Sequence, residues 1–234
     1  MTDNTTPAAL LIADISGYTA FVRLHAMSVS HAQEITARLL GALVRVARPP
    51  LQVAEIEGDA VFFYAPAGRR PLEETMEGVK FQILGLFRAF ASELDAITAV
   101  RSCPCDACGA AGTLQLKQVL HAGTVGMQRI DRFEKPFGLD VILAHRILKN
   151  EVASKEYLLV TDTAYEVGDG FYGLEPEDHQ EEFEGVGAVG LKVFYPSNFG
   201  DLPIAGEERP SASRLRATLW KLGMQLRTFL NRYR

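Results

Sequence analysis

Several features that would set this chain apart from ordinary globular proteins are absent. No apolar run approaches the roughly 18 residues that a membrane-spanning helix requires. The first residues, Met1–Asn4, carry neither the basic nor the apolar region of a secretory signal peptide. With 47% hydrophobic and 23% charged residues, the 234-residue chain has the composition of a globular protein with a substantial core. We therefore expect a cytoplasmic protein.

Acidic residues are missing from one part of the chain. The chain has 24 Lys and Arg residues against 29 Asp and Glu, yet residues 209–234 hold seven basic and no acidic residues. The first 208 residues are consequently strongly acidic. Because nucleic-acid backbones require basic surfaces, this charge argues against a nucleic-acid partner.

Cysteine is scarce and confined to one segment. Cys103, Cys105 and Cys108 fall within six residues, in an insertion at about 101–112. A disulfide is disfavoured in a reducing cytoplasm, whereas this spacing is typical of a structural zinc site. Such a site needs a fourth ligand, for which Asp106, His121 or a group on a second subunit are candidates. The alternative is an exposed, redox-sensitive thiol cluster.

Two aspartates follow apolar, strand-like runs. Asp14 ends the first run, and Asp59 lies in a turn between the second and third. Carboxylates at neighbouring strand ends are suitable ligands for a pair of hard divalent cations such as Mg²⁺. Ser16 and Gly17 then open an expected helix whose free N–H groups can bind a polyphosphate. The alternative is that Asp14 is a helix N-cap and Gly58-Asp59 an ordinary hairpin turn.

The periodicity of apolar residues predicts an α+β fold. Strands are expected at 8–14, 51–56, 60–64, 114–120, 123–129, 157–160 and 191–195, and helices at 18–25, 31–47, 72–97, 139–148 and 163–167. This order fits a ferredoxin-like plan, with a mostly antiparallel sheet and helices on one face. We expect one domain at 1–200, followed by a linker and a C-terminal helix at 201–234.

The expected C-terminal helix is basic and amphipathic. Its apolar residues recur at alternating spacings of four and three, at Leu215, Leu219, Leu222, Leu226, Phe229 and Tyr233. A period of 3.5 residues suits packing against another helix, and the basic surface suits weak contact with anionic lipid. We predict that the helix supports dimerisation, with weak peripheral contact at the inner membrane surface as the second alternative.

Four segments resemble the catalytic domain of class III nucleotidyl cyclases, in the order of that family. They are Ala13–Thr19, Glu55–Ala60, Leu116–Gly123 and Phe137–Arg146. The similarity runs from about Ala9 to Tyr195 and includes closing strands around Phe183–Val186 and Val193–Tyr195. The sequence of His145–Asn150 and the cysteine insertion resemble those of an uncharacterised bacterial branch of this family, DUF2652. The resemblance implies the nucleotide cyclase fold.

The resemblance also implies an activity, the conversion of GTP or ATP to a 3′,5′-cyclic nucleotide and pyrophosphate. Asp14 and Asp59 match the family's metal-binding aspartates, with the Ile15 carbonyl as a further ligand, for two Mg or Mn ions. Arg146 matches the arginine that stabilises the transition state, a role suited to a planar, always charged guanidinium. Sites in this family lie between head-to-tail subunits, which implies a homodimer in which Asp14 and Asp59 face Arg146 of the partner subunit.

Three features depart from the family pattern. The ribose-binding asparagine falls on Ile142, which offers no hydrogen bond, and the phosphate-contacting lysine falls on Glu184 or Val186. The base-reading pair falls on Glu55 and Lys135. Glu55 matches the glutamate of guanine-selective members and can accept from guanine N1–H, while Lys135 can donate to a carbonyl oxygen. Alternatively, the two side chains neutralise each other across an empty pocket.

Two functions therefore compete for this chain. The first is an active purine nucleotide cyclase. The second is a catalytically degenerate cyclase-fold module that binds nucleotide or metal and acts as a regulatory or dimeric scaffold, since losing one transition-state contact costs about 10²–10³ in rate. Neither His121 nor His145 is needed by the two-metal mechanism, and a histidine in an apolar strand such as that of His121 is more often a hydrogen-bonded core residue.

Overall fold

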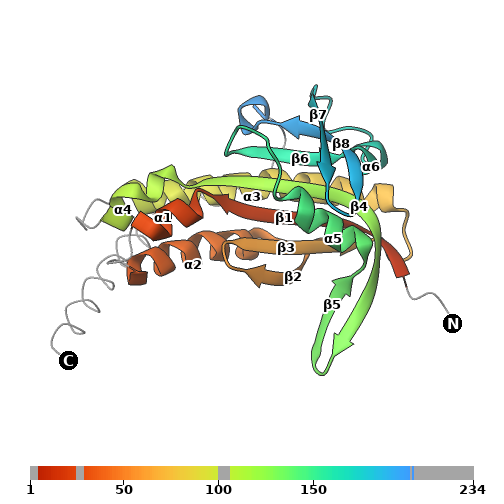
Figure 1. Ribbon diagram of the computed structural model, residues 1–234, viewed down its shortest axis with the longest axis horizontal. Helices are drawn as coiled ribbons and strands as arrows, with labels where there is room; N and C mark the ends of the chain where they lie inside the picture. The colour runs from red at the N-terminus through yellow and green to blue at the C-terminus, as the bar shows by residue number, and fades with distance from the viewer. Residues whose placement is uncertain (1–4, 25–28, 100–105, 201, 203–234) are drawn as a thin grey trace.

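The computed structural model describes residues 5–24, 29–99, 106–200 and 202 (Figure 1). The C-terminal helix expected within 201–234, Cys103 and Cys105 lie outside the described residues. In the described part of the chain, no helix combines the length and apolar character needed to cross a membrane.

One eight-stranded sheet forms the centre of the molecule, in the order β2-β3-β1-β4-β6-β8-β7, with β5 paired to β4. Its strands are β1 (Thr5–Ser16), β2 (Gln52–Glu57), β3 (Ala60–Pro66), β4 (Gln115–Ile130), β5 (Phe133–Phe137), β6 (Tyr157–Thr161), β7 (Glu177–Phe183) and β8 (Gly187–Phe194). Only β4 and β6 pair in parallel among these strands. The predicted α+β class with a mostly antiparallel sheet is confirmed.

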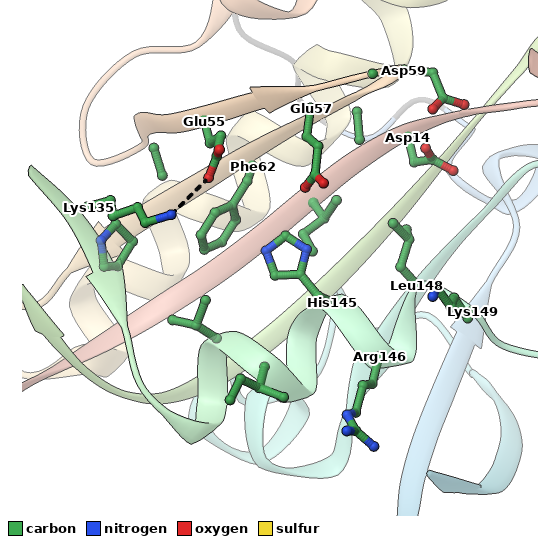
Figure 2. Close-up of a pocket in the computed structure, with 17 residues that line it drawn as sticks. Asp14, Glu55, Glu57, Asp59, Phe62, Lys135, His145, Arg146, Leu148 and Lys149 are labelled. Atoms are coloured by element: carbon green, nitrogen blue, oxygen red, sulfur yellow. Dashed lines mark ion pairs between the residues drawn. The ribbon is translucent and has the colours of Figure 1, made fainter. Parts of the chain in front are cut away.

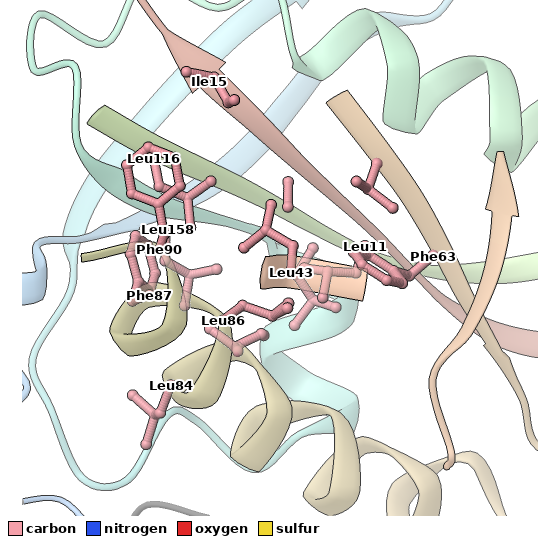
Figure 3. Packing of buried hydrophobic residues seen from close by; sticks show 14 of the residues in the cluster. Leu11, Ile15, Leu43, Phe63, Leu84, Leu86, Phe87, Phe90, Leu116 and Leu158 are labelled. Carbon is pink, nitrogen blue, oxygen red and sulfur yellow. The ribbon is translucent and has the colours of Figure 1, made fainter. Parts of the chain in front are cut away.

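Most helices cover one face of this sheet. They are α1 (Tyr18–Leu24), α2 (Val29–Val46), α3 (Leu72–Ala99), α4 (Asp106–Ala110) and α6 (Asp162–Val167), with short 3₁₀ turns at η2 (Ala111–Thr113) and η3 (Pro196–Asn198). Leu11 and Ile15 of β1 pack in the same buried cluster as Leu43 of α2 and Phe87 and Phe90 of α3 (Figure 3). This large core holds the sheet rigid beneath the site.

Helix α5 (Leu139–Ile147) lies on the opposite face of the sheet. Successive residues of a strand point to opposite faces, and the alternate residues Leu10 and Ile12 of β1 pack with Ala144 of α5. Ile147 packs with Val119 of β4 in a third cluster. In addition to the expected layer of helices on one face of the sheet, one helix, α5, therefore covers part of the other face.

Two strands differ from the sequence prediction. The predicted strand pair across 114–129 is wrong: β4 is continuous, and its hairpin partner is β5, which pairs Phe137 with Gly126. Gly123 lies inside β4 without forming a turn, opposite Ala8 of β1. Strand β7 was not predicted, because its sequence, Glu-Asp-His-Gln-Glu-Glu-Phe, is almost entirely polar. Polar residues are tolerated there because β7 lies at the edge of the sheet and pairs with β8 alone among the described strands.

Candidate functional site

A pocket of about 840 Å³ lies between the β2–β3 hairpin and α5 (Figure 2). Acidic side chains line the wall formed by β1 and the hairpin, and basic side chains line the wall formed by β5 and α5. Of the residues that the sequence predicted for the site, the pocket brings together Asp14, Glu55, Asp59, Lys135, Ile142 and Arg146.

Asp14 lies near the end of β1 and is only 8% exposed. It pairs across the sheet with Lys117 of β4, and its Oδ2 lies 3.1 Å from Lys117 Nζ. The same ammonium donates to the carbonyl oxygen of Leu148, at the C-terminal end of α5, over 3.1 Å. Helix α1 begins at Tyr18, so Asp14 is not its N-cap.

Asp59 and Gly58 form the tight turn between β2 and β3. Gly58 in this turn has a φ of +59°, a conformation that favours glycine. The backbone carbonyl of Asp59 accepts a 3.1 Å hydrogen bond from the Ile15 N–H, which holds the turn against the end of β1. Burial, followed by the charge of Asp14, raises the pKa of Asp59 to about 6. The chain thus holds two carboxylates whose mutual repulsion a bound cation relieves.

These donors suit a hard cation that takes its other ligands from substrate and water. The chain offers two carboxylates and the carbonyl of Ile15 at one strand end, and Mg²⁺ is usually bound by one or two carboxylates plus phosphates. Among the described residues, no group of three or more His, Cys, Asp or Glu side chains is arranged to hold a metal ion.

Glu55 of β2 and Lys135 of β5 form an ion pair across the pocket (Figure 2). Glu55 Oε2 lies 3.8 Å from Lys135 Nζ, and each side chain is about half exposed. An exposed pair of this kind contributes about 0–1 kcal/mol to stability. The ion pair therefore places one hydrogen-bond acceptor beside one donor, and separating the two side chains costs little free energy.

Arg146 and Ile142 are carried by α5, one turn apart. The guanidinium of Arg146 points away from Asp14 and Asp59 (Figure 2). Its Nη1 lies 3.6 Å from the position that a Cβ on Gly185 would take, in the turn between β7 and β8. No carboxylate of the described residues forms an ion pair with Arg146.

Other residues of the pocket escaped the sequence interpretation. Lys117 contacts Asp14 because the two residues pair across β1 and β4, a register that the sequence does not show. Glu57 adds a third carboxylate that points into the pocket (Figure 2). His145 packs edge-on against Phe62, with ring centroids 5.0 Å apart.

Some predicted residues lie elsewhere. Ser16 is the last residue of β1 and Gly17 connects β1 to α1, and neither lines this pocket. Cys108 lies in α4 on the other face of the sheet, with its Sγ 3.9 Å from His31 Nδ1. His121 is wrong as the fourth ligand of a zinc site there, because its two ring nitrogens contact side chains near α5 and β6.

Residues 36–157, more than half of the chain, match the model of a family described as "Protein of unknown function (DUF2652)". The chain belongs to this family. A curated relative, "Uncharacterized protein Rv2561/Rv2562" of Mycobacterium tuberculosis (strain ATCC 25618 / H37Rv), is 32% identical over 151 residues, which cover 64% of this DUF2652 chain and 68% of the relative.

Solved structures with a similar fold include cyclases. The guanylyl cyclase Cya2 superimposes with a TM-score of 0.61 at 16% identity, covering 82% of the DUF2652 chain and 93% of its own. The adenylyl cyclase CyaB from P. aeruginosa gives a TM-score of 0.62 at 15% identity, with 81% and 94% covered. The DUF2652 chain therefore has the fold of class III nucleotidyl cyclase catalytic domains.

Proposed function

We propose that this DUF2652 protein is a nucleotidyl cyclase, which converts GTP or ATP to a 3′,5′-cyclic nucleotide and pyrophosphate. The observation that carries the proposal is the pair Asp14 and Asp59, held at one strand end with a raised pKa on Asp59. The fold shared with Cya2 and CyaB supports the proposal by analogy.

Asp14 and Asp59, with the Ile15 carbonyl, hold two Mg or Mn ions in this proposal. Bound there, the ions supply activation of the ribose 3′-hydroxyl and neutralisation of the triphosphate. Lys117 already neutralises part of the Asp14 charge from the sheet side. Arg146 stabilises the charge that develops on the phosphate, and as a permanent cation it needs no proton transfer to do so.

The active unit in this proposal is a head-to-tail homodimer. Arg146 points away from the carboxylates of its own protomer, so a second protomer must supply the guanidinium that reaches them. Large apolar side chains are exposed on β2, around β5 and on α5, at Ile56, Ile130, Phe133, Phe137, Leu139 and Ile142. Exposed apolar surfaces of this kind mark interfaces, and we assign this one to the partner subunit. The β4–β5 hairpin also projects from the sheet (Figure 1).

Glu55 and Lys135 read the base in this proposal. Their carboxylate and ammonium complement the N1–H and carbonyl oxygen of guanine, and also the amino group and N1 of adenine. Because the pair is half exposed, a base displaces it at a cost of about 0–1 kcal/mol.

The second candidate is a nucleotide-binding module without turnover. Ile142 exposes 50% of its side chain at the ribose-binding position and offers no hydrogen bond. The turn that Arg146 faces carries Glu184, whose charge opposes a phosphate. Both features favour slow or absent chemistry while leaving Asp14 and Asp59 intact.

Turnover with all four nucleoside triphosphates separates these candidates. We expect a cyclic purine nucleotide, detected by mass spectrometry, in the presence of Mg²⁺ or Mn²⁺. Asp14→Ala and Asp59→Ala abolish it, whereas Asp95→Ala, on an exposed turn of α3, leaves it unchanged. Thermal stabilisation by nucleotide without product supports the module instead, and neither product nor stabilisation refutes both.

Two further assignments remain proposals. A structural zinc bound by Cys103, Cys105 and Cys108 is supported by the spacing of the thiols, and His31 beside Cys108 adds a candidate ligand. Metal analysis of protein purified without chelator, compared with Cys108→Ser, tests it.

The C-terminal helix is proposed to support dimerisation, with peripheral membrane contact as the second alternative. Truncation after Glu208, followed by analytical ultracentrifugation, tests that order.

A further inference from the structure

A chain of hydrogen bonds joins the N-terminal end of α5 to the sheet, away from the metal carboxylates. Asp140, the second residue of α5, accepts a 2.6 Å hydrogen bond from the N–H of Thr124 through Oδ2. Its Oδ1 lies 3.1 Å from Nε2 of His121 in β4. His121 Nδ1 lies 3.0 Å from the hydroxyl of Thr161 at the end of β6.

Asp140 sets the direction of this network, because a carboxylate only accepts hydrogen bonds. Thr161 Oγ1 accepts from the N–H of Ala164 over 3.3 Å, as the N-cap of α6, and can donate its own hydrogen to His121 Nδ1 or to the hydroxyl of Thr163, 3.0 Å away. The proton of a neutral His121 then resides on Nε2 and is donated to Asp140. Each group in this chain has a partner, and the arrangement requires one tautomer.

The backbone of β4 is built to accept this carboxylate. A Cβ on Gly123 would lie 2.2 Å from Cγ of Asp140, which is far inside contact distance. Only glycine at 123 therefore allows Asp140 to lie against the strand. This explains the glycine within a continuous strand, where it otherwise costs stability.

The three side chains superficially resemble a hydroxyl–imidazole–carboxylate nucleophile. Thr161 is 1% exposed and His121 3% exposed, so no substrate reaches the hydroxyl. Burial lowers the pKa of His121 more than Asp140 raises it, so the neutral ring is favoured. The cluster is therefore not a second active site.

The first turn of α5 needs such an anchor because apolar packing holds mainly the rest of the helix. Ala144 and Ile147 are buried and Val141 and Leu143 pack against the same clusters, whereas Leu139 is 83% exposed and the N-cap Gly138 supplies no side-chain hydrogen bond. Short helices are marginal without tertiary contacts. Arg146 lies six residues beyond Asp140, about 9 Å along the helix axis, so any displacement of the first turn is transmitted to its guanidinium.

We propose that Asp140 and His121 are positioning residues, which hold α5 in one place on β4 and thereby aim Arg146. The catalytic part of this inference rests on the proposed function, but the anchoring part does not. A rotation or slide of α5 by a fraction of a turn misplaces Arg146 while leaving Asp14 and Asp59 where they are.

Thr161→Val tests the proposal, with Thr161→Ser as the matched control. Valine removes the hydroxyl at nearly constant shape, while serine keeps it. By hydrogen-exchange mass spectrometry we expect about tenfold faster exchange of the α5 amides in Thr161→Val, because the hydrogen bond to His121 is lost. The amides of α6 should also exchange faster, because the variant removes the N-cap of that helix, whereas β1–β3 should keep wild-type rates. Thr161→Ser should restore α5 to within about threefold of wild type.

Two further readouts distinguish positioning from general stability. Nitrogen NMR of labelled wild-type protein should show His121 neutral and protonated on Nε2, and Asp140→Asn should speed α5 exchange as Thr161→Val does. If the protein turns over nucleotide, kcat per folded molecule falls about tenfold in Asp140→Asn with KM unchanged, because Arg146 acts in the transition state.

Several outcomes overturn the inference. They are a proton on Nδ1, unchanged α5 exchange in both Asp140→Asn and Thr161→Val, or acceleration spread evenly over the sheet. Absence of turnover in the wild type refutes the proposed cyclase without touching the anchor, since exchange and NMR need no substrate.

Discussion

The two ends of α5 are attached to the same strand, β4, in different ways. At the N-terminal end, Asp140 accepts hydrogen bonds from Thr124 and His121, and neither Asp140 nor His121 forms a hydrogen bond or ion pair with Asp14 or Asp59. At the C-terminal end, Lys117 donates to the Leu148 carbonyl and also contacts Asp14. The first attachment does not involve the charged residues of the pocket. The second depends on Lys117, whose ammonium also forms the ion pair with Asp14.

This difference separates a fixed end from a responsive end. A cation at Asp14 competes with Lys117 for the carboxylate and leaves the ammonium to the Leu148 carbonyl or to a phosphate. Events in the pocket are therefore felt at the C-terminal end of α5, close to Arg146, while the N-terminal end keeps its place. Each prediction below disturbs one end or the pocket beside it.

The largest effect is expected from Gly123→Ala at the fixed end. The new methyl group collides with Asp140, so the anchor breaks and the strand is overpacked, which lowers the free energy of unfolding by about 2–4 kcal/mol. Denaturant unfolding measures the loss. Gly85→Ala in α3, where a Cβ meets nothing within 4 Å, is the control and should stabilise by about 0.5–1 kcal/mol. Equal losses in the two variants would contradict the anchor.

Lys117→Met disturbs the responsive end. It leaves the largely buried Asp14 without its counter-charge, and we expect a loss of about 2 kcal/mol in metal-free protein, measured by denaturant unfolding. Saturating Mn²⁺ should recover part of the loss, because the cation replaces the missing charge. The same loss with and without Mn²⁺ would show that Lys117 acts independently of the metal carboxylates.

Asp59→Asn changes the dependence of stability on pH. The raised pKa of Asp59 means that its stabilising contribution is complete below its unfolded value of 3.8 and is lost as the pH rises through about 6. In EDTA, the asparagine variant should therefore be more stable than wild type by about 1 kcal/mol near pH 7.5, allowing for solvent screening, and no more stable near pH 4. Thermal unfolding across this range measures the difference, and a wild type that is more stable at both pH values would show that the charge of Asp59 is not destabilised by burial and by Asp14.

The smallest effect on stability is expected from Glu55→Gln. Its ion pair with Lys135 touches neither end of α5 and is half exposed, so the unfolding free energy should change by less than about 0.5 kcal/mol. Nucleotide-dependent thermal stabilisation should change more, with an altered preference between guanine and adenine nucleotides, because the amide of glutamine donates as well as accepts. A large fall in stability with unchanged nucleotide preference would assign the pair a structural role instead.

Local pattern predicted much of this molecule. The apolar run before Asp14 and the helical stripe through Leu39 and Leu43 identify β1 and α2, and both aspartates were found because they end such runs. These signals are local, since they depend on the period of side chains along one element.

Contacts across elements were harder to predict. Lys117 belongs to the site because of its cross-strand register with Asp14, which no single segment encodes. Gly123 was taken for the start of a second strand because its partner, Asp140, is 17 residues away and comes into contact only when α5 folds onto β4. Strand β7 has an exposed edge and few apolar residues, so it lacks the alternation that reveals a strand.

The steric exclusion at Gly123 constrains how the sequence of this chain can change. A side chain at position 123 and a carboxylate at position 140 cannot occupy the same space, so the two positions cannot drift separately. A relative that acquires even alanine at 123 must first replace the aspartate, and His121 then loses the acceptor that selects its tautomer. Loss of the anchor therefore leaves a recognisable order of substitutions, with 140 changing before 123.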